Sequence, residues 1–146
     1  MSASDPLPTV PVPTVGVICL RDDQVLLIKR GTAPRLGQWS LPGGRLEWGE
    51  TTGVGALREL AEETGVQAHL LGLVDAVDGL FTSRTTGETT RHYLMIDYAA
   101  RWVSGEPVAG DDAAEARFVS REAALEMVEW DVTRAVIDET FERFGG

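Results

Sequence analysis

Residues 43–66, with the sequence GGRLEWGETTGVGALRELAEETGV, decide how the rest of this chain is interpreted. They combine a glycine turn with a run that can form a helix, and within that run Glu59, Glu62 and Glu63 are spaced at i, i+3 and i+4. Residues at this spacing lie on one face of a helix. The segment therefore predicts a helix that presents three carboxylates on the same side.

The other residues of this helix suggest which face is buried. A helical projection at about 100° per residue places four residues on a predicted core side, Val54, Leu57, Ala61 and Thr64. Like charges on the opposite side destabilise a helix by about 0.2–0.5 kcal/mol per pair, unless a cation neutralises them. Hard oxygen ligands favour Mg²⁺ or Mn²⁺ over zinc. An isolated E-x-x-E-E motif is better explained as a solvated acidic face, so the flanking residues decide between the two interpretations.

Those flanking residues resemble a known family. Every defined position of the Nudix hydrolase signature, G-x5-E-x7-R-E-U-x-E-E-x-G-U with U aliphatic, is filled as required by Gly44, Glu50, Arg58, Glu59, Leu60, Glu62, Glu63, Gly65 and Val66. A match at so many positions over 23 residues is far more specific than a short glycine motif. A weaker resemblance extends to the preceding strands and to residues 105–120.

The resemblance implies hydrolysis of a phosphoanhydride bond that depends on Mg²⁺ or Mn²⁺. Glu59 and Glu63 would be the main metal ligands. Glu62 would complete the site or hold a metal-bound water, and the carbonyl of Gly43 would add a backbone ligand. We call Glu59, Glu62 and Glu63 the signature glutamates.

The resemblance also implies roles for residues that are not direct ligands. The family counterparts of Glu50 and Arg58 orient the loop against the helix and steady the metal-binding glutamates. A carboxylate from outside the signature often acts as base or additional ligand in this family. Comparison with family members favours Asp112 for that role, followed by Glu115, while Glu88 and the signature glutamates remain alternatives.

Several other side chains are candidates for substrate contacts. Arg45 follows the glycine turn directly, and Arg35 and Trp39 lie shortly before it. Arginine is a good bidentate partner for phosphate, and a tryptophan ring can stack on a base. We therefore predict that Arg35, Arg45 and Trp39 contact the substrate.

The substrate class follows from the resemblance alone. The stretches GQWSLPGGRLEWGE and GDDAAEARFVS look most like small members of the ADP-ribose pyrophosphatase type. The leading hypothesis is thus an enzyme that cuts a nucleoside diphosphate linked to another moiety, such as ADP-ribose. Alternatives are a nucleoside triphosphate pyrophosphohydrolase that removes oxidised nucleotides, or a non-catalytic sensor of nucleotide sugars. A degenerate sensor would be expected to lack a signature glutamate, and all three are present.

Composition bounds the size and partners of the protein. A chain of 146 residues with 43% hydrophobic content can fill one core. We expect a flexible, proline-rich tail over residues 1–11 and a single domain over residues 12–146. The net charge of -10 argues against nucleic-acid and anionic-membrane partners, which need a basic surface. The expected partner is a small nucleotide, and a homodimer is left possible.

Cysteine usage and the absence of targeting features suggest a compartment. Cys19 is the only cysteine, so no intramolecular disulfide can form, and we expect it to pack in a strand. No apolar run approaches the roughly 20 residues of a membrane span, and the N-terminus has no features of a secretory signal. A cytoplasmic protein is therefore expected.

The periodicity along the chain predicts an α/β protein. Strands are expected at residues 14–20, 24–30, 67–76, 91–103 and 116–120. Helices are expected after Ser120, as N-cap, and from Asp131, as a second cap. Residues 78–90 are polar and contain glycine, which predicts a flexible loop over a substrate cleft. The Nudix resemblance implies the detailed architecture, an α/β/α sandwich with a mixed sheet.

Overall fold

A computed structural model describes residues 9–32 and 35–145 of the protein. Within them the chain forms seven strands and three helices: β1 Val12–Arg21, β2 Gln24–Arg30, β3 Trp39–Ser40, β4 Gly43–Arg45, α1 Thr52–Thr64, β5 Gln67–Thr82, β6 Thr89–Ser104, β7 Ala113–Ser120, α2 Arg121–Met127 and α3 Asp131–Phe144. Residues 1–8 of the predicted tail lie outside the described part, and residues 9–11 precede β1. None of the described helices is long and apolar enough to cross a membrane.

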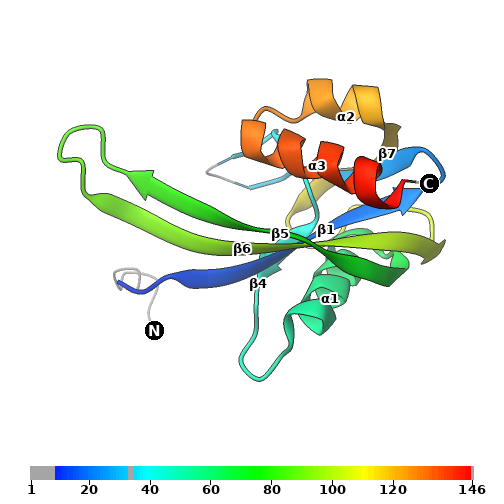
Figure 1. Ribbon diagram of the computed structural model, residues 1–146, viewed down its shortest axis with the longest axis horizontal. Helices are drawn as coiled ribbons and strands as arrows, with labels where there is room; N and C mark the ends of the chain where they lie inside the picture. Colours follow the sequence, from blue (N-terminus) through cyan, green and yellow to red (C-terminus); the bar gives the residue numbers. More distant parts are fainter. Residues whose placement is uncertain (1–8, 33–34, 146) are drawn as a thin grey trace.

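Strand β1 lies at the centre of a mixed sheet (Figure 1). It pairs in parallel with β6 and antiparallel with β4, and β5 pairs antiparallel with β6. Its pairing with β2 is confined to the hairpin end, where Leu20 and Arg21 face Val25 and Gln24. β2 also pairs with β7 along its whole length, and beyond the hairpin end it pairs with β3 at Ile28 and Lys29. The sheet therefore has two parts that are joined at this hairpin. One part contains β1, β4, β5 and β6, and the other contains β2, β3 and β7.

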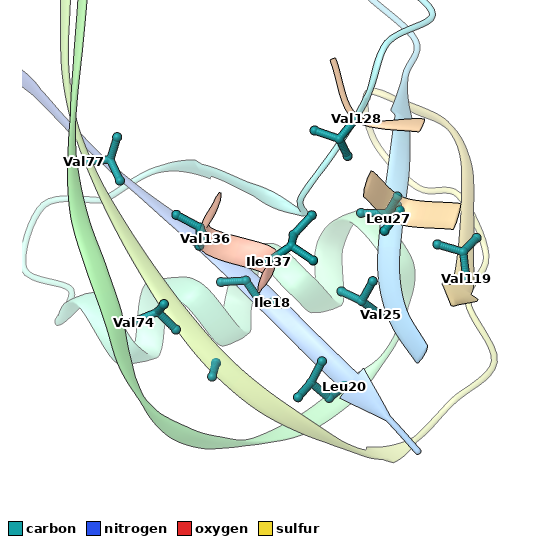
Figure 2. Packing of buried hydrophobic residues seen from close by; sticks show 12 residues of the cluster. Ile18, Leu20, Val25, Leu27, Val74, Val77, Val119, Val128, Val136 and Ile137 are labelled. Atoms are coloured by element: carbon teal, nitrogen blue, oxygen red, sulfur yellow. The ribbon is translucent and has the colours of Figure 1, made fainter. Parts of the chain in front are cut away.

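Helices cover both faces of the sheet, which confirms the predicted α/β/α sandwich. Alternating residues of β1 point to opposite faces. Val17 and Cys19 pack into a cluster with Ala56 and Leu60 of α1, while Ile18 packs into a second cluster that includes residues of α2 and α3. Figure 1 shows α1 on one side of the sheet and α2 and α3 on the other, and Figure 2 shows the second cluster. Cys19 is buried in a strand, as predicted.

The buried face of α1 differs from the predicted one. The buried residues of the helix are Gly55, Ala56, Leu60, Glu63 and Thr64, whereas Val54 is 61% exposed. Of the four residues predicted to face the core, only Thr64 is buried. The prediction was wrong because it assigned every glutamate to the solvent side, and Glu63 is buried against β4.

The predicted loop at residues 78–90 is mostly strand. β5 continues to Thr82 and β6 begins at Thr89, so only the turn between them is irregular. Cross-strand pairs such as Val77 with Met95 and Gly79 with Tyr93 hold the segment in a long hairpin that projects from the body (Figure 1). The prediction failed because these pairing partners lie on another strand and leave no trace in the local composition.

Two other boundaries also differ from the predicted ones. β7 begins at Ala113, earlier than predicted, because it pairs with β2 as far as Arg30. The hydroxyl of Ser120 caps α2 by accepting a hydrogen bond from Ala123 N at 3.1 Å, as predicted. Asp131 is not a cap: it is the first residue of α3, and Trp130 occupies the cap position without a side-chain hydrogen bond.

Candidate active site

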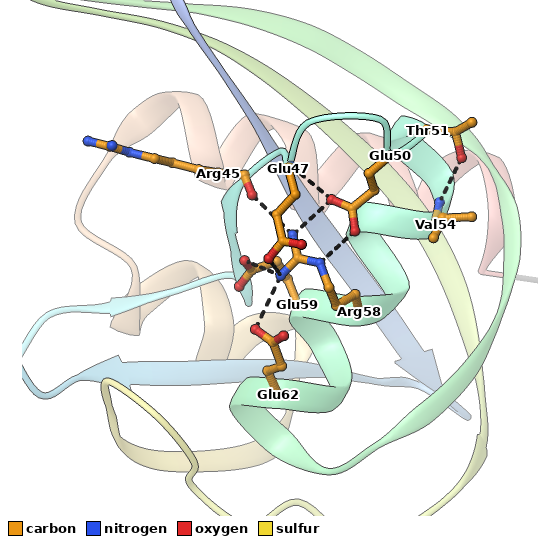
Figure 3. Close-up of polar contacts among 8 residues, drawn as sticks. All are labelled: Arg45, Glu47, Glu50, Thr51, Val54, Arg58, Glu59 and Glu62. Carbon is orange, nitrogen blue, oxygen red and sulfur yellow. Dashed lines mark hydrogen bonds and ion pairs between the residues drawn. The ribbon is translucent and has the colours of Figure 1, made fainter. Parts of the chain in front are cut away.

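Arg58 is the centre of a network of polar contacts on α1 (Figure 3). Its Nε donates to Oε2 of Glu50 at 2.6 Å, and its Nη2 donates to Oε1 of Glu50 at 2.9 Å. Nη1 donates to Oε1 of Glu59 at 2.9 Å and to Oε2 of Glu62 at 3.2 Å. Nη2 also donates to the carbonyl of Arg45 at 3.1 Å. One guanidinium thus ties the loop before α1, strand β4 and two signature glutamates together.

These contacts also fix the charge of Glu50. The hydrogen bonds from Arg58 and from the backbone N–H of Glu47, at 3.0 Å, lower the pKa of Glu50 to about 2. The bond to Glu50, supported by Glu59, raises the pKa of Arg58 above its ordinary value. Both partners therefore remain ionised at neutral pH.

The glycine turn brings β4 into contact with two signature glutamates. The N–H of Gly43 donates to Oε1 of Glu63 at 2.7 Å. A Cβ atom on Gly44 would lie 2.7 Å from the carboxylate oxygens of Glu59, closer than such atoms approach in real structures. Only glycine at residue 44 lets the Glu59 carboxylate pack directly against this backbone.

The environment of Glu63 disfavours its charged form. The residue is 7% exposed, and burial raises the pKa of its carboxyl to about 7. The hydrogen bond from Gly43 opposes this rise, and the nearby charge of Glu59 adds to it. A carboxylate that is buried and surrounded by negative charge is stabilised by a cation at the same place.

A cavity of about 1110 Å³ begins at the signature glutamates and extends over the sheet to the start of α3. Its size is sufficient for a nucleotide with a second moiety attached. Its charged lining consists of four arginines and seven carboxylates: Arg30, Arg35, Arg45, Arg91, Glu59, Glu62, Glu63, Asp97, Asp111, Asp112 and Glu129. The excess of carboxylates would repel a diphosphate unless cations changed the local sign.

The predicted substrate contacts all line this cavity. Arg35, Trp39 and Arg45 lie on its wall. The guanidinium of Arg35 lies over the ring of Phe81 at 5.3 Å and over the ring of Trp130 at 5.5 Å. These two rings are 6.5 Å apart, so the far end of the cavity carries an aromatic pair with a cation above it.

The structure distinguishes between the candidate residues for the general base. Asp112 lines the cavity, next to Asp111. Glu115 and Glu88 do not belong to the lining formed by the described residues. Glu115 instead pairs with Lys29 across the strands at 3.4 Å, and Glu88 lies at the tip of the β5–β6 hairpin.

The signature glutamates do not converge on a single point. Among the described residues, no three side chains of His, Cys, Asp or Glu are grouped as a ready metal cluster. Arg58 draws Glu59 and Glu62 toward itself, whereas Glu63 is turned toward Gly43. The donors present are nevertheless all oxygens beside one cavity, and this donor chemistry suits a hard divalent cation.

The cavity residues that the sequence did not predict include Arg30 and Asp97, besides the aromatic pair Phe81 and Trp130. The Nε of Arg30 is buried without a hydrogen-bond partner among the described residues, at the end of β2. Asp97 of β6 also lines the cavity, and burial together with the charge of Asp75 raises its pKa to about 6. A single acidic residue among the apolar positions of a predicted strand was the available signal for Asp97, whereas Arg30 resembled an ordinary strand end.

Comparison with known proteins identifies the family. The sequence matches the NUDIX domain family over residues 10–139. The chain belongs to the Nudix family. Its fold agrees with that of the NUDIX domain of Shewanella oneidensis NrtR, whose structure was determined with ADP ribose. The TM-score is 0.76, with 22% identity, and the match covers 92% of this chain and 89% of that one.

Relatives of this Nudix chain carry two kinds of name. It is 38% identical over 108 residues to the ADP-ribose pyrophosphatase of Methanocaldococcus jannaschii, which is 74% of this chain and 61% of that protein. It is also 38% identical over 97 residues to the putative 8-oxo-dGTP diphosphatase 2 of Mycobacterium tuberculosis H37Rv, covering 65% of this chain and 64% of that one. The chain thus spans less than two thirds of the length of these relatives. Hydrolases of this family generally need divalent cations.

Proposed function

We propose that this protein hydrolyses the phosphoanhydride bond of a nucleoside diphosphate linked to another moiety, with ADP-ribose as the leading substrate. The observation that carries the proposal is one cavity that joins the signature glutamates to the aromatic pair Phe81 and Trp130. The family and the relative named ADP-ribose pyrophosphatase support it. A diphosphate would lie at the glutamates and a nucleoside toward the rings.

The residues that would hold Mg²⁺ or Mn²⁺ are Glu59, Glu63 and Glu62, with the carbonyl of Gly43. A bound divalent cation would screen the diphosphate charge and lower the pKa of a water molecule. The excess of carboxylates in the cavity and the raised pKa of Glu63 support this assignment.

Arg58 and Glu50 would hold the ligands rather than touch the substrate. Neither residue belongs to the cavity lining. The two hydrogen bonds to Glu50 hold the Arg58 guanidinium in place. The same guanidinium donates hydrogen bonds to Glu59 and Glu62. A carboxylate oxygen of Asp112 would accept the proton of the attacking water, because Asp112 lines the same cavity.

The arginines and tryptophan of the cavity would bind the remainder of the substrate. Arg45 continues directly from the glycine turn, so its guanidinium would bind phosphate oxygens. Trp39 and Arg35 would contact the nucleoside or the second moiety. Arg30 would add a further donor, since its buried Nε has no partner among the described residues.

The proposal also covers the compartment, the partners and the assembly of the protein. We infer a cytoplasmic enzyme whose partner is a small nucleotide rather than a nucleic acid or a membrane. The single domain over residues 12–146 and a homodimer are further parts of this proposal.

A substrate panel tests the proposed function. Purified protein is incubated with ADP-ribose, NADH, dinucleoside polyphosphates, 8-oxo-dGTP and ordinary dNTPs, each with Mg²⁺, with Mn²⁺ and with excess EDTA. Chromatography then separates AMP and ribose 5-phosphate, the expected products from ADP-ribose. Glu63→Gln serves as the inactive comparison. The absence of cation-dependent hydrolysis from every substrate would overturn the proposal.

A second candidate function is removal of oxidised nucleoside triphosphates. The similarity to the putative 8-oxo-dGTP diphosphatase 2 favours it. In that case the panel would yield 8-oxo-dGMP and pyrophosphate, with ADP-ribose a poor substrate. Binding of ADP-ribose without any cleavage would instead favour the non-catalytic sensor.

A further inference from the structure

Four residues on neighbouring strands form a row across the sheet. Gly43 of β4 pairs with Gly16 of β1, Gly16 pairs with Asp97 of β6, and Asp97 pairs with Asp75 of β5. The row begins at the backbone N–H that holds Glu63. The row therefore connects the backbone beside the signature glutamates with Asp97.

The glycine at residue 16 leaves room for a side chain from the neighbouring strand. Gly16, Gly43 and Asp97 all line the cavity. A Cβ atom on Gly16 would collide with Oδ1 of Asp97, so the Asp97 carboxylate lies over Gly16. From β6 it thus leans toward the signature glutamates and not away from them.

Residues 9–32 and 35–145 provide no hydrogen-bond donor to this carboxylate. None of the hydrogen bonds found among the described residues ends on Asp97, and the charged group that acts on it is the carboxylate of Asp75. A largely buried polar group without a partner is unfavourable unless something else satisfies it. Asp97 lines the cavity, so a ligand bound there can donate a hydrogen bond to this carboxylate.

The position of Asp97 indicates which part of a substrate it faces. Neighbouring strands are about 4.8 Å apart, so the backbone of Asp97 lies two strands, or roughly 10 Å, from Gly43, while its carboxylate reaches back over Gly16 and lies nearer. With the diphosphate at the signature glutamates, this carboxylate would face the part of the substrate that follows the diphosphate on the nucleoside side. A carboxylate repels phosphate oxygens and accepts hydrogen bonds from amines and hydroxyls.

We propose that Asp97 accepts a hydrogen bond from the nucleoside half of the substrate, either from the exocyclic amine of the base or from the ribose 2′-hydroxyl. The proposal rests on the proposed function in assuming that the diphosphate lies at the signature glutamates. Asp97 then has two effects: it selects nucleosides with a donor at this point, and it prevents the substrate from binding in the reverse direction with phosphate near Asp97.

The test compares Asp97→Val, which removes the acceptors of the side chain, with the wild type. Asp97→Asn is a second, more conservative variant. The matched control is Asp78→Asn, because Asp78 is an exposed acid of the same hairpin that does not line the cavity. Three substrates are used: ADP-ribose, its inosine analogue without the amine, and its analogue with 2′-deoxyadenosine.

We expect Asp97→Val to lower kcat/KM for ADP-ribose by roughly 10- to 100-fold, the effect of losing a hydrogen bond to a charged group, and Asp78→Asn to leave it unchanged. If the amine is the donor, the inosine analogue is already poor for the wild type and loses nothing further in Asp97→Val. If the hydroxyl is the donor, the 2′-deoxy analogue is instead the poor substrate for the wild type, and Asp97→Val causes no further loss with it. Equal losses for all three substrates, or no loss for any, would overturn the proposal.

Binding and stability measurements distinguish a contact with the nucleoside from a purely structural role for Asp97. Calorimetry with a methylene-bridged, uncleavable analogue of ADP-ribose should show weaker binding to Asp97→Val, and unchanged binding would contradict the proposed contact. A purely structural role would lower the melting temperature of both variants, whereas we expect it to stay the same or rise. If the wild type cleaves no substrate yet binds this analogue through Asp97, the proposed hydrolysis fails while the inference about Asp97 stands.

Discussion

Arg58 donates two hydrogen bonds to Glu50, from Nε to Oε2 at 2.6 Å and from Nη2 to Oε1 at 2.9 Å. The pair joins residues eight positions apart and fixes the loop before α1 to the helix. The same guanidinium binds Glu59 through Nη1. A change at Arg58 should therefore displace the proposed metal ligands, although Arg58 itself would not contact the substrate.

Arg58→Ala tests this indirect role. Removal of the guanidinium frees Glu50 and Glu59, and a displacement of about 1 Å at a reacting group can cost on the order of 100-fold in rate. We expect kcat to fall by that order and the Mg²⁺ concentration for half-maximal activity to rise. Arg134→Ala, which removes an exposed ion pair with Asp131 on α3, is the control. An unchanged Mg²⁺ titration would show that Arg58 does not position the ligands.

Glu63→Gln tests the proposed metal ligand itself. The amide keeps an oxygen that can accept from the N–H of Gly43, so the fold should be retained. Loss of the charge should lower kcat at least about 100-fold, which corresponds to about 3 kcal/mol in the barrier. Glu139→Gln, on the surface of α3, should behave as the wild type. Full activity of Glu63→Gln, or of the wild type in excess EDTA, would contradict the metal-dependent mechanism.

Gly44→Ala tests the close contact between β4 and Glu59. The added methyl group would have to occupy the place of the Glu59 carboxylate, which lies 2.7 Å from the Cβ position. The carboxylate must then move away from Nη1 of Arg58. We expect weaker Mg²⁺ binding and a loss of turnover of roughly 10- to 100-fold, with a folded protein by circular dichroism. Wild-type Mg²⁺ dependence would show that Glu59 tolerates the displacement.

The sequence predicted those features that a local pattern determines. The i+8 spacing of Glu50 and Arg58 belongs to the family signature, and their contact is present in the structure. The β2 strand has the predicted bounds, and Ser120 caps α2 as predicted. The roles of these residues in metal binding stay predictions.

Features that depend on distant partners could not be read from the sequence. Glu63 is buried because a backbone N–H twenty residues away, on β4, bonds its carboxylate. Residues 78–82 are strand because β6 pairs with them. Asp97 reaches the cavity only through the register of β1 and β6, which places it beside Gly16. Each of these facts comes from a contact between segments far apart in the sequence, and no local periodicity encodes it.

The raised pKa of Asp97 predicts a dependence of stability on pH. Burial and the charge of Asp75 raise this pKa from 3.8 to about 6 in the folded protein. The unfolded chain therefore binds fewer protons between these values, so the contribution of Asp97 to stability is present below about pH 4 and is lost as the pH rises through about 6.

Asp97→Asn should remove this loss. Its free energy of unfolding should match that of the wild type near pH 4 and exceed it at pH 7, by up to about 3 kcal/mol. Urea unfolding of both proteins in EDTA at several pH values measures the difference. A difference that does not grow with pH would show that Asp97 is ionised normally in the folded protein.

The last prediction concerns the carboxylate from outside the signature. Asp112 lines the cavity, whereas Glu115 pairs with Lys29 at 3.4 Å and does not belong to that lining. If Asp112 accepts the proton of the attacking water, Asp112→Asn should lower kcat strongly with little change in KM, because a group used mainly in the transition state contributes little to ground-state binding. Glu115→Gln should be mild. The reverse ranking would transfer the role to Glu115, and two variants with near-normal kcat would leave the base among the signature glutamates or at Glu88.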